Sequence, residues 1–322
     1  MFAAYAESIN RDDPLAGLVL GDRPEPDVPD GWAVVTVKAA ALNHHDVWSL
    51  KGQGLAEDKL PMILGCDAAG VDADGNEVVV HAVLSDPAWM GDETLDPKRS
   101  LLSERSQGCF AERVAVPRRN VVAKPSSLSF EEAACLPTAW LTAYRMLFTQ
   151  SGLRPGDSVL VQGAGGGVAT ALITLARAGG LRVFATSRDE RKRARALELG
   201  AHEVFEPGAR LPVRVDAVME TVGAATWSHS LKSLRPGGTV VLSGTTSGPQ
   251  PDNAELTRVF FLQLRIQGST MGTRDELREL TQLLDLTGAR PLVDRVLPMD
   301  RAREGFEAMV SGDLFGKVVF TL

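Results

Sequence analysis

The hydrophobic pattern divides the chain into two regions of different character. Up to about residue 124, short apolar runs separated by Gly, Pro and Asp predict the strands of a mainly β domain. The clearest of these runs are 32–37, 77–81 and 110–116. Residues 86–107 are polar and show no period, which predicts a long loop.

From Ser129 onward, apolar strand-like runs alternate with helical patterns. Ser129 and Glu132 match a capping box, which predicts a helix that continues to about Gln150. Strands are then predicted at 159–163, 182–186, 215–219, 238–243 and 265–268, with helices at 166–178, 189–199, 224–234 and 254–264. This alternation predicts a parallel sheet with helices on both faces.

The last fifty residues return to a mixed pattern. A helix is predicted at 275–286, a strand at 293–297, then a short helix and a terminal strand at 316–320. The order along the chain is therefore β-rich, then alternating, then a short mixed tail.

A glycine cluster marks the most informative point of the alternating region. The strand at 159–163 runs into Gly163-Ala-Gly-Gly-Gly167, and the cluster opens the next helix. Glycines allow a tight turn and close approach of a pyrophosphate, and the helix N-terminus supplies free N–H groups. In this βαβ context the cluster predicts a dinucleotide-binding fold; the alternative is an ordinary glycine-rich loop.

Composition and charge narrow the class of protein. The 322 residues carry a net charge of −7, so nothing favours a nucleic acid or an anionic membrane as partner. Three widely spaced cysteines make no disulfide framework, which is typical of a reducing compartment. Since the sequence shows neither a signal-peptide pattern nor a run of eighteen apolar residues, we expect a cytoplasmic protein.

Several motifs together resemble the medium-chain dehydrogenase/reductase superfamily, specifically its zinc-free, quinone-oxidoreductase-like branch. They are Ala41-Leu-Asn-His-His-Asp-Val-Trp48, Leu64-Gly-Cys-Asp-Ala-Ala-Gly70, Gly108-Cys-Phe-Ala-Glu112, Leu141-Thr-Ala-Tyr144, Gly268-Ser-Thr-Met-Gly272 and Phe315-Gly-Lys-Val-Val319. The resemblance covers almost the whole chain. It implies a Rossmann doubly wound parallel sheet, expected at 125–268, inserted in a mainly β, GroES-like catalytic domain expected at 1–124 and 269–322.

The resemblance also shows what this chain lacks. Where zinc-dependent relatives hold their catalytic metal, this sequence has Asn43, Cys66 and Thr138. An amide oxygen and a hydroxyl are poor zinc ligands beside thiolate and imidazole. The segment that matches the structural-zinc lobe, about 86–107, contains no cysteine. We therefore expect no metal.

The cofactor expected from the resemblance is NADP(H). At the end of the second strand, NAD-dependent folds place an acidic residue that binds the ribose hydroxyls. This sequence has Ser187 followed by Arg188, with Lys192 a turn later, groups that suit a 2′-phosphate. The alternative is that these basic residues only solvate a helix, and Asp189 and Glu190 weaken their field.

Further positions match cofactor-lining segments of the family. Those in the glycine loop are Ala164, Gly166, Gly167 and Val168. Those elsewhere are Thr142, Val222, Gly244, Thr245, Ser269, Thr270, Met271 and Lys317. Lys317 matches a basic residue that contacts the pyrophosphate in relatives, although a surface lysine is an equally acceptable reading.

The expected reaction is hydride transfer to a small-molecule electron acceptor, a quinone or an α,β-unsaturated carbonyl. In this scheme Asn43 donates its amide N–H to the developing oxyanion. His45 passes a proton or only fixes a loop, and Asp46 orients that loop. The apolar run Phe260–Ile266 at the last strand, together with the family's two-fold dimers, predicts a homodimer.

Two alternatives remain open at the level of sequence. One is a zinc-dependent alcohol dehydrogenase with an atypical ligand set. The other is an NADPH-binding sensor or accessory protein without turnover, because a fold does not guarantee an activity.

Overall fold

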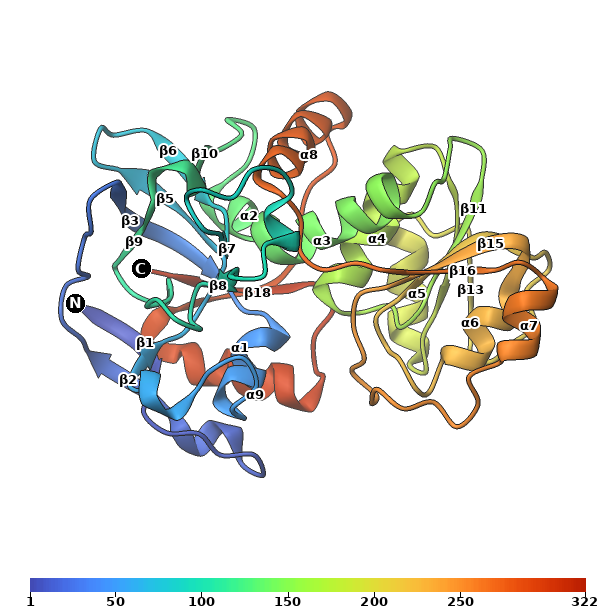
Figure 1. Cartoon of the computed structure of the whole chain (residues 1–322), viewed down its shortest axis with the longest axis horizontal. Coiled ribbons are helices and arrows are strands. Elements are labelled where there is room, and N and C mark those ends of the chain that lie inside the picture. The colour runs from blue at the N-terminus through green and yellow to red at the C-terminus, as the bar shows by residue number, and fades with distance from the viewer. The chain divides into compact units, whose positions relative to one another are not determined.

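The computed structural model describes all 322 residues and divides into two compact units, shown in Figure 1. Unit 1 combines both ends of the chain, Met1–Leu141 and Met271–Leu322, and unit 2 is Thr142–Thr270. None of the helices has the length and apolar character needed to cross a membrane.

Unit 1 is built around a mainly antiparallel sheet in the order β10-β6-β5-β3-β18-β17, with β9 paired to β3. Its strands are β3 (Trp32–Ala41), β5 (Ala68–Asp72), β6 (Glu77–Val80), β9 (Arg113–Pro117), β10 (Val121–Ala123), β17 (Val293–Pro298) and β18 (Lys317–Thr321). The C-terminal β18 pairs antiparallel with β3, with Val319 opposite Ala41. Both ends of the chain therefore build one sheet.

Smaller elements complete unit 1. They are β1 (Phe2–Ala6), β2 (Leu18–Asp22), β4 (Met62–Ile63), β7 (Val83–Leu84), β8 (Ser100–Leu101), α1 (His44–Leu50), α2 (Phe130–Ala134), α8 (Arg274–Thr287) and α9 (Ala302–Ser311). The buried aromatic rings of Phe110, Phe306 and Phe320 contact one another in the core. The segment 86–107, expected as a featureless loop, contains β8, which pairs with β7.

Unit 2 is a six-stranded sheet in the order β13-β12-β11-β14-β15-β16, and every pair in it is parallel. Its strands are β11 (Ser158–Val161), β12 (Arg182–Thr186), β13 (Glu203–Phe205), β14 (Val215–Glu220), β15 (Leu234–Leu242) and β16 (Arg265–Gly268). Its helices are α4 (Gly167–Ala178), α5 (Glu190–Leu199), α6 (Trp227–Ser233) and α7 (Leu256–Phe261). The predicted parallel βα sheet is confirmed, because apolar strands such as β11 and β14 are buried on both faces.

The helix predicted from Ser129 to Gln150 is interrupted. Ser129 caps α2 as expected, because its Oγ accepts from Glu132 N and Glu132 Oε2 accepts from Ser129 N. Beyond α2 the backbone takes π-helical turns at 136–140 and 145–150, on either side of the short α3 (Leu141–Tyr144). Pro137 has no N–H to continue the α-helical ladder, which accounts for the first interruption.

The first unit boundary lies later in the chain than the expected residue 124. Unit 1 continues to Leu141 because α2 packs on β3 and β5 of its sheet. The return to unit 1 at Met271 lies close to the expected residue 269.

Candidate functional site

A capped helix holds the first polar groups of unit 1. Asn43 stands at the N-cap of α1, and its backbone N–H donates to Asp46 Oδ2 over 2.8 Å. The other oxygen, Oδ1, accepts from Gly65 N at 3.0 Å. Asp46 is fully buried, so its carboxylate ties α1 to the loop before β5. These hydrogen bonds fit the prediction that Asp46 orients this loop.

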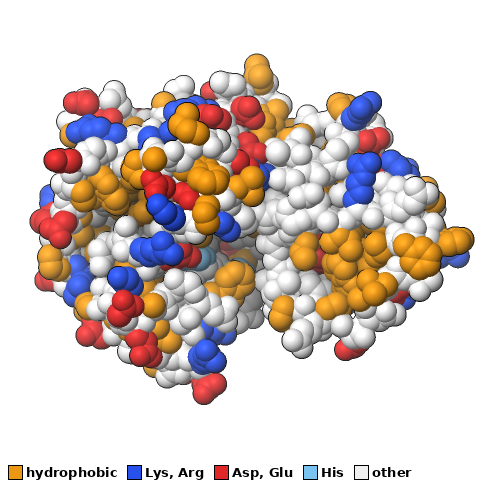
Figure 2. Space-filling model, viewed as in Figure 1, with side chains coloured by type: hydrophobic (Ala, Val, Ile, Leu, Met, Phe, Trp, Pro, Cys, Tyr) orange, Lys and Arg blue, Asp and Glu red, His pale blue; other side chains and the backbone are white.

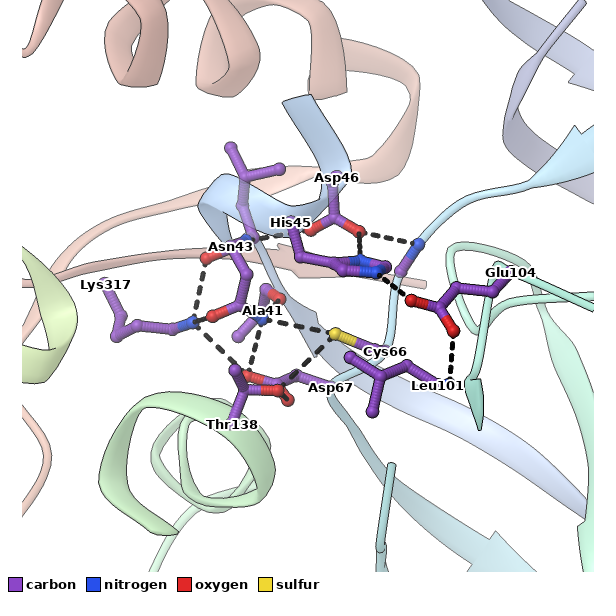
Figure 3. A network of polar contacts seen from close by, with 12 residues as sticks. Ala41, Asn43, His45, Asp46, Cys66, Asp67, Leu101, Glu104, Thr138 and Lys317 are labelled. Atoms are coloured by element: carbon purple, nitrogen blue, oxygen red, sulfur yellow. Dashed lines mark hydrogen bonds and ion pairs between the residues drawn. The ribbon is translucent and has the colours of Figure 1, made fainter. Parts of the chain in front are cut away.

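His45 projects from α1 between two carboxyl groups, as Figure 3 shows. Its Nε2 lies 3.2 Å from Glu104 Oε1, and its Nδ1 lies 4.0 Å from Asp46 Oδ1. Burial alone would lower the pKa of His45, but the contacts with Asp46, Cys66 and Glu104 raise this pKa well above its ordinary value. These contacts therefore favour the imidazolium form of His45.

Glu104 is the partner that keeps this proton in place. Burial alone would raise its pKa, but hydrogen bonds from His45 and Leu101 N, with the charge of His45, hold the pKa below its ordinary value. The side chains of His45 and Glu104 are 14% and 21% exposed, so the pair is the part of the cluster that water reaches. We refer to these two residues as the acid pair.

Lys317 lies in the same cluster but has a different environment from the one expected. Its ammonium donates to Leu42 O at 2.8 Å, to Asn43 Oδ1 at 2.6 Å and to Asp67 Oδ2 at 3.3 Å (Figure 3). The residue is 2% exposed. Because all three N–H groups have partners inside unit 1, the expected contact with a pyrophosphate is not supported.

The amide group of Asn43 likewise makes its hydrogen bonds to partners inside unit 1. Its Nδ2 donates to Asp67 Oδ2 at 2.8 Å and to Ala41 O at 3.2 Å, while Oδ1 accepts from Lys317. An amide nitrogen carries two hydrogens, and both are in use. These contacts give Asn43 a structural role, in which it connects Lys317 to Asp67, and they do not support the expected role as an oxyanion donor, which stays a prediction.

Asp67 is the centre of this second group. It is fully buried and also accepts from Thr138 Oγ1 at 2.5 Å. Burial raises the pKa of its carboxyl, opposed by Lys317, Asn43 and Thr138. We refer to Asn43, Asp67, Thr138 and Lys317 as the buried ion cluster.

The positions where zinc-dependent relatives hold a metal do not fit one here. Asn43 and Thr138 are occupied by the buried ion cluster, and the Lys317 ammonium lies 2.6 Å from Asn43 Oδ1. Burial, and then the charge of Asp67, raise the pKa of the remaining thiol, Cys66. A protonated thiol beside a fixed cation is a poor metal ligand.

A second trio, His45, Asp46 and Cys66, has ligand atoms within 4.8 Å of one another. His45 Nδ1 is buried and has no hydrogen-bond partner, which is the feature that most favours a cation here. However, a metal needs a free lone pair on His and a thiolate on Cys. The surroundings raise the pKa of both groups, which favours their protonated forms over the forms that bind zinc.

Unit 2 has a candidate phosphate-binding site at its glycine loop and the N-terminus of α4. We refer to this site as the dinucleotide cradle. Gly163 and Gly165 have φ angles of +75° and +140°, conformations that favour glycine. Gly166 is the N-cap of α4, and a Cβ built there would meet no atom within 4 Å. Open space at a helix N-terminus after a parallel strand fits a dinucleotide phosphate.

Two basic side chains border this cradle. A Cβ built on Gly165 would lie 2.9 Å from Lys192 Cδ and 3.5 Å from Lys192 Nζ, so the lysine side chain crosses the loop. Arg188 follows Ser187 at the end of β12 and is exposed. Asp189 caps α5 by accepting from Arg191 N and Lys192 N, so its carboxylate is occupied near the loop.

The remaining expected cofactor positions fall mostly in unit 2. Val222 N and Gly223 N donate to Glu220 Oε1, which fixes the loop after β14. Ala164 N donates to Thr186 O at 2.7 Å, and Thr142 is buried. Gly167 and Val168 open α4, Gly244 and Thr245 follow β15, and Ser269 and Thr270 follow β16, whereas Met271 belongs to unit 1.

Sequence reasoning missed Glu104, Asp67 and Glu220 as members of the sites. Glu104 lies in the polar segment that shows no pattern, so no local signal marks it. Asp67 stands inside the quoted motif Leu64–Gly70 and directly follows the thiol. Glu220 ends an apolar strand, where a single acidic residue is a usable signal for a ligand-facing or loop-fixing group.

Comparisons with known proteins agree with this architecture. Residues 29–126 match the family "Alcohol dehydrogenase GroES-like domain", and residues 167–285 match the family "Zinc-binding dehydrogenase". A quinone oxidoreductase of Lama guanicoe is 27% identical over 90% of this chain and 88% of its own length.

Two solved structures extend the comparison. An NAD-dependent alcohol dehydrogenase is 35% identical, with a TM-score of 0.92, and each chain is covered completely. A crotonyl-CoA carboxylase/reductase in complex with NADP is 25% identical over 100% of this chain and 95% of its own, with a TM-score of 0.90.

Proposed function

The chain belongs to the medium-chain dehydrogenase/reductase superfamily, and from this premise we propose an NADPH-dependent reductase of quinones or α,β-unsaturated carbonyl compounds. The acid pair is the observation that supports this most strongly. Unit 1 offers an imidazole hydrogen-bonded to a partly exposed carboxyl group, a proton donor that needs no metal, whereas an alcohol dehydrogenase needs a metal to polarise its substrate.

The donor chemistry of the site favours an activated substrate. A plain ketone concentrates the developing charge on one oxygen, and the buried ion cluster has no donor left to receive it. Conjugation spreads that charge, so a proton donor is sufficient. The quinone oxidoreductase and the crotonyl-CoA carboxylase/reductase among the similar proteins carry names that fit this class.

Unit 2 holds the proposed cofactor. The backbone at Gly166 and the N-terminus of α4 receive the pyrophosphate, while Arg188 and Lys192 favour a 2′-phosphate over a bare ribose. Bound NADPH supplies hydride; this is the part of the chemistry that belongs to the cofactor. The preference for NADPH over NADH rests on these two basic residues and on the absence of a carboxylate at Ser187.

The acid pair supplies the proton. The proton lies between His45 Nε2 and Glu104 Oε1, and the partly exposed Glu104 presents it to the substrate, so the two residues deliver it as a unit. Hydride addition to an enone leaves a negative charge on substrate carbon and oxygen, and transfer of this proton completes the reduction. His45 is then neutral, and it regains a proton from water through the partly exposed Glu104.

The buried ion cluster positions this acid. Lys317 and Asp67 hold Asn43, and Asn43 begins the helix that carries His45. None of these side chains has a free donor for the substrate. Their contribution is to fix the N-terminus of α1, and their loss affects the acid pair only indirectly.

Assembly and location complete the proposal. Strand β16 is the outer strand of the unit 2 sheet, and all four of its residues are exposed. Hydrophobic side chains gather over the neighbouring α7 at the right-hand end of Figure 2. We propose a homodimer joined along β16. The three free, buried cysteines fit a reducing cytoplasm.

The test is NADPH oxidation with a naphthoquinone, cyclohexenone and cyclohexanone, alongside elemental analysis of the purified protein. We expect turnover of the first two, little of the third, and no stoichiometric zinc. Efficient cyclohexanone reduction with about one zinc per chain would instead identify an alcohol dehydrogenase with atypical ligands. NADPH binding without any turnover would identify a sensor or accessory protein.

A further inference from the structure

We propose that unit 2 contains a second ligand site, a basic cavity that binds a small phosphate-bearing anion and is coupled to the glycine loop. The cavity has a volume of about 400 Å³. Its charged and polar side chains are Arg210, Arg214, His229, Lys232, Ser233 and Arg258. They come from the loop before β14, from α6 and from α7.

Positive charge in this cavity is poorly neutralised, although the chain as a whole carries −7. Glu255 is the one carboxylate within ion-pair distance, 3.4 Å from Lys232 Nζ and 3.6 Å from Arg258 Nε. The Arg258 Nε is buried and has no hydrogen-bond partner. A site with an excess of cations, one of them with a buried N–H that makes no hydrogen bond, is suited to a phosphate group.

The arginines of the loop add to this excess. Arg214 donates to the carbonyl groups of Lys232 and Leu234, which fixes the guanidinium without cancelling its charge. Arg210 is exposed and forms no ion pair. The cavity therefore combines a guanidinium that is held in place, that of Arg214, with an exposed one, that of Arg210, which can move to contact an anion.

The basic cavity is separate from the dinucleotide cradle. Arg214 immediately precedes β14, and Ser233 immediately precedes β15, so these groups lie at the amino ends of parallel strands. The glycine loop follows the carboxyl end of β11. Open parallel sheets bind dinucleotides at the carboxyl edge, so Arg214 and Ser233 lie at the other edge, and His229 is the cavity residue that reaches Gln162 at the carboxyl edge.

A chain of hydrogen bonds connects the basic cavity to the glycine loop. His229 Nε2 donates to Ala209 O at 2.8 Å, so its Nδ1 accepts from Gln162 Nε2 at 2.9 Å. Gln162 Oε1 accepts from Thr186 Oγ1 at 2.6 Å, and Thr186 Oγ1 accepts from Gly163 N at 3.3 Å. Gln162 and Thr186 are buried.

A branch of the chain reaches the loop after β14. Gln162 Nε2 also donates to Ser230 Oγ at 3.0 Å, and Ser230 donates to Glu220 Oε2 at 2.5 Å. Glu220 in turn accepts from Val222 N and Gly223 N. The glycine loop and the loop after β14 are thus both connected to the side-chain amide of Gln162.

The direction of coupling follows from His229. His229 lines the basic cavity, so an anion that draws its ring toward the cavity breaks the hydrogen bond from Gln162 Nε2 to His229 Nδ1. Gln162 must then reorient, which releases Thr186 and Gly163. Occupation of the basic cavity therefore weakens dinucleotide binding, and the reverse holds by linkage. This coupling rests on the proposed nucleotide cofactor, whereas the anion site does not.

The binding test is calorimetric titration of the full chain with inorganic pyrophosphate, with and without saturating NADPH. We expect binding in both conditions and at least about a tenfold loss in R210A/K232A. Arg154→Ala is the matched control, because it removes an exposed arginine of unit 2 outside the cavity. Equal affinity in wild type and double variant, or complete displacement of pyrophosphate by NADPH, would overturn the site.

The coupling test measures the Kd of NADPH with and without pyrophosphate in wild type and in Thr186→Val. The valine keeps the shape of the side chain and removes the hydroxyl between Gln162 and Gly163. We expect pyrophosphate to raise the Kd several-fold in wild type only. The same shift in both proteins would overturn the hydrogen-bond route. Failure of NADPH to bind wild type would count against the proposed cofactor, while the pyrophosphate titration would still decide the anion site.

Discussion

His45 illustrates how neighbouring charges decide the state of one residue. An isolated histidine titrates near pH 6.5, and burial in an apolar site would favour its neutral form. Here Asp46 and Glu104 lie on either side of the ring, and their effect outweighs that of burial. The neighbouring carboxyl groups thereby favour the acid form of this side chain over the neutral base.

The first prediction concerns this acid. Because the folded pKa of His45 is raised, the imidazolium form persists through neutral pH and is lost as pH rises through that pKa. The kcat for cyclohexenone should therefore be constant at neutral pH and fall at alkaline pH. His45→Gln should lower this kcat by about 10²-fold and remove the alkaline decline.

The control for this prediction is His44→Gln, which changes the adjacent, exposed histidine. It should retain both the rate and the alkaline decline. A quinone substrate should depend less on His45, since its reduced form exchanges protons with water. An unchanged pH profile in His45→Gln, measured by steady-state NADPH oxidation, would contradict the assignment.

The second prediction concerns the buried pair of Lys317 and Asp67, whose side chains are 3% and 0% exposed. Lys317→Met leaves the Asp67 carboxyl buried without its cation, and we expect a loss of about 3–5 kcal/mol in unfolding free energy. K317M/D67N removes both charges and should recover part of this loss. Urea unfolding of the wild type, both single variants and the double variant measures the coupling. Strictly additive effects would show that the pair is not coupled.

At the scale of elements, the proposed nucleotide makes two kinds of contact. Its pyrophosphate lies at the glycine loop and helix α4, and its 2′-phosphate lies at Arg188. Gly166 has a φ of −76°, and a Cβ there meets no protein atom, so alanine does not strain the fold. The added methyl enters the space proposed for the pyrophosphate. Arg188, at the end of β12, is proposed to act on the 2′-phosphate alone.

The third prediction compares these two contacts. Gly166→Ala should weaken NADPH and NADH alike by about tenfold while the melting temperature stays close to that of wild type. Arg188→Ala should weaken only NADPH, by about ten- to a hundredfold. Arg191→Ala, an exposed arginine of α5, serves as the control. Fluorescence titration with both nucleotides decides; equal losses for both nucleotides in Arg188→Ala would refute its selective role.

At the scale of the whole molecule, the outer strand β16 determines the expected assembly. Leu256, Phe260 and Phe261 on the preceding α7 are 71%, 70% and 76% exposed, and the backbone of β16 has one unpaired edge. Exposed apolar side chains beside an unpaired edge invite pairing with a second copy.

The fourth prediction is a homodimer with twice the chain mass of 34.4 kDa, measured by light scattering at micromolar concentration. Ile266→Lys places a charge on β16 and should shift the mass to that of one chain. Leu286→Lys, at an exposed leucine of unit 1, should leave the dimer intact. A wild-type mass of one chain, or no effect of Ile266→Lys, would contradict pairing along β16.

The sequence by itself determined the features that depend on local pattern. The apolar runs and glycine cluster gave the parallel sheet and the cradle at α4, because period and turn chemistry act within a few residues. The Ser129 cap was also found locally. The interruption after α2 was not, although Pro137 stood in the sequence as a breaker.

Only the tertiary structure decided the chemistry of the candidate site. The register of β18 against β3 sets Val319 opposite Ala41, which places Lys317 beside Asn43 across 274 positions of sequence. Glu104 reaches His45 from a segment without a pattern. Such contacts join residues far apart in the chain, where no periodicity operates. For that reason the sequence identified Asn43, His45 and Lys317 as candidates, but only the fold shows their hydrogen-bond partners and the effect of those partners on the pKa of His45.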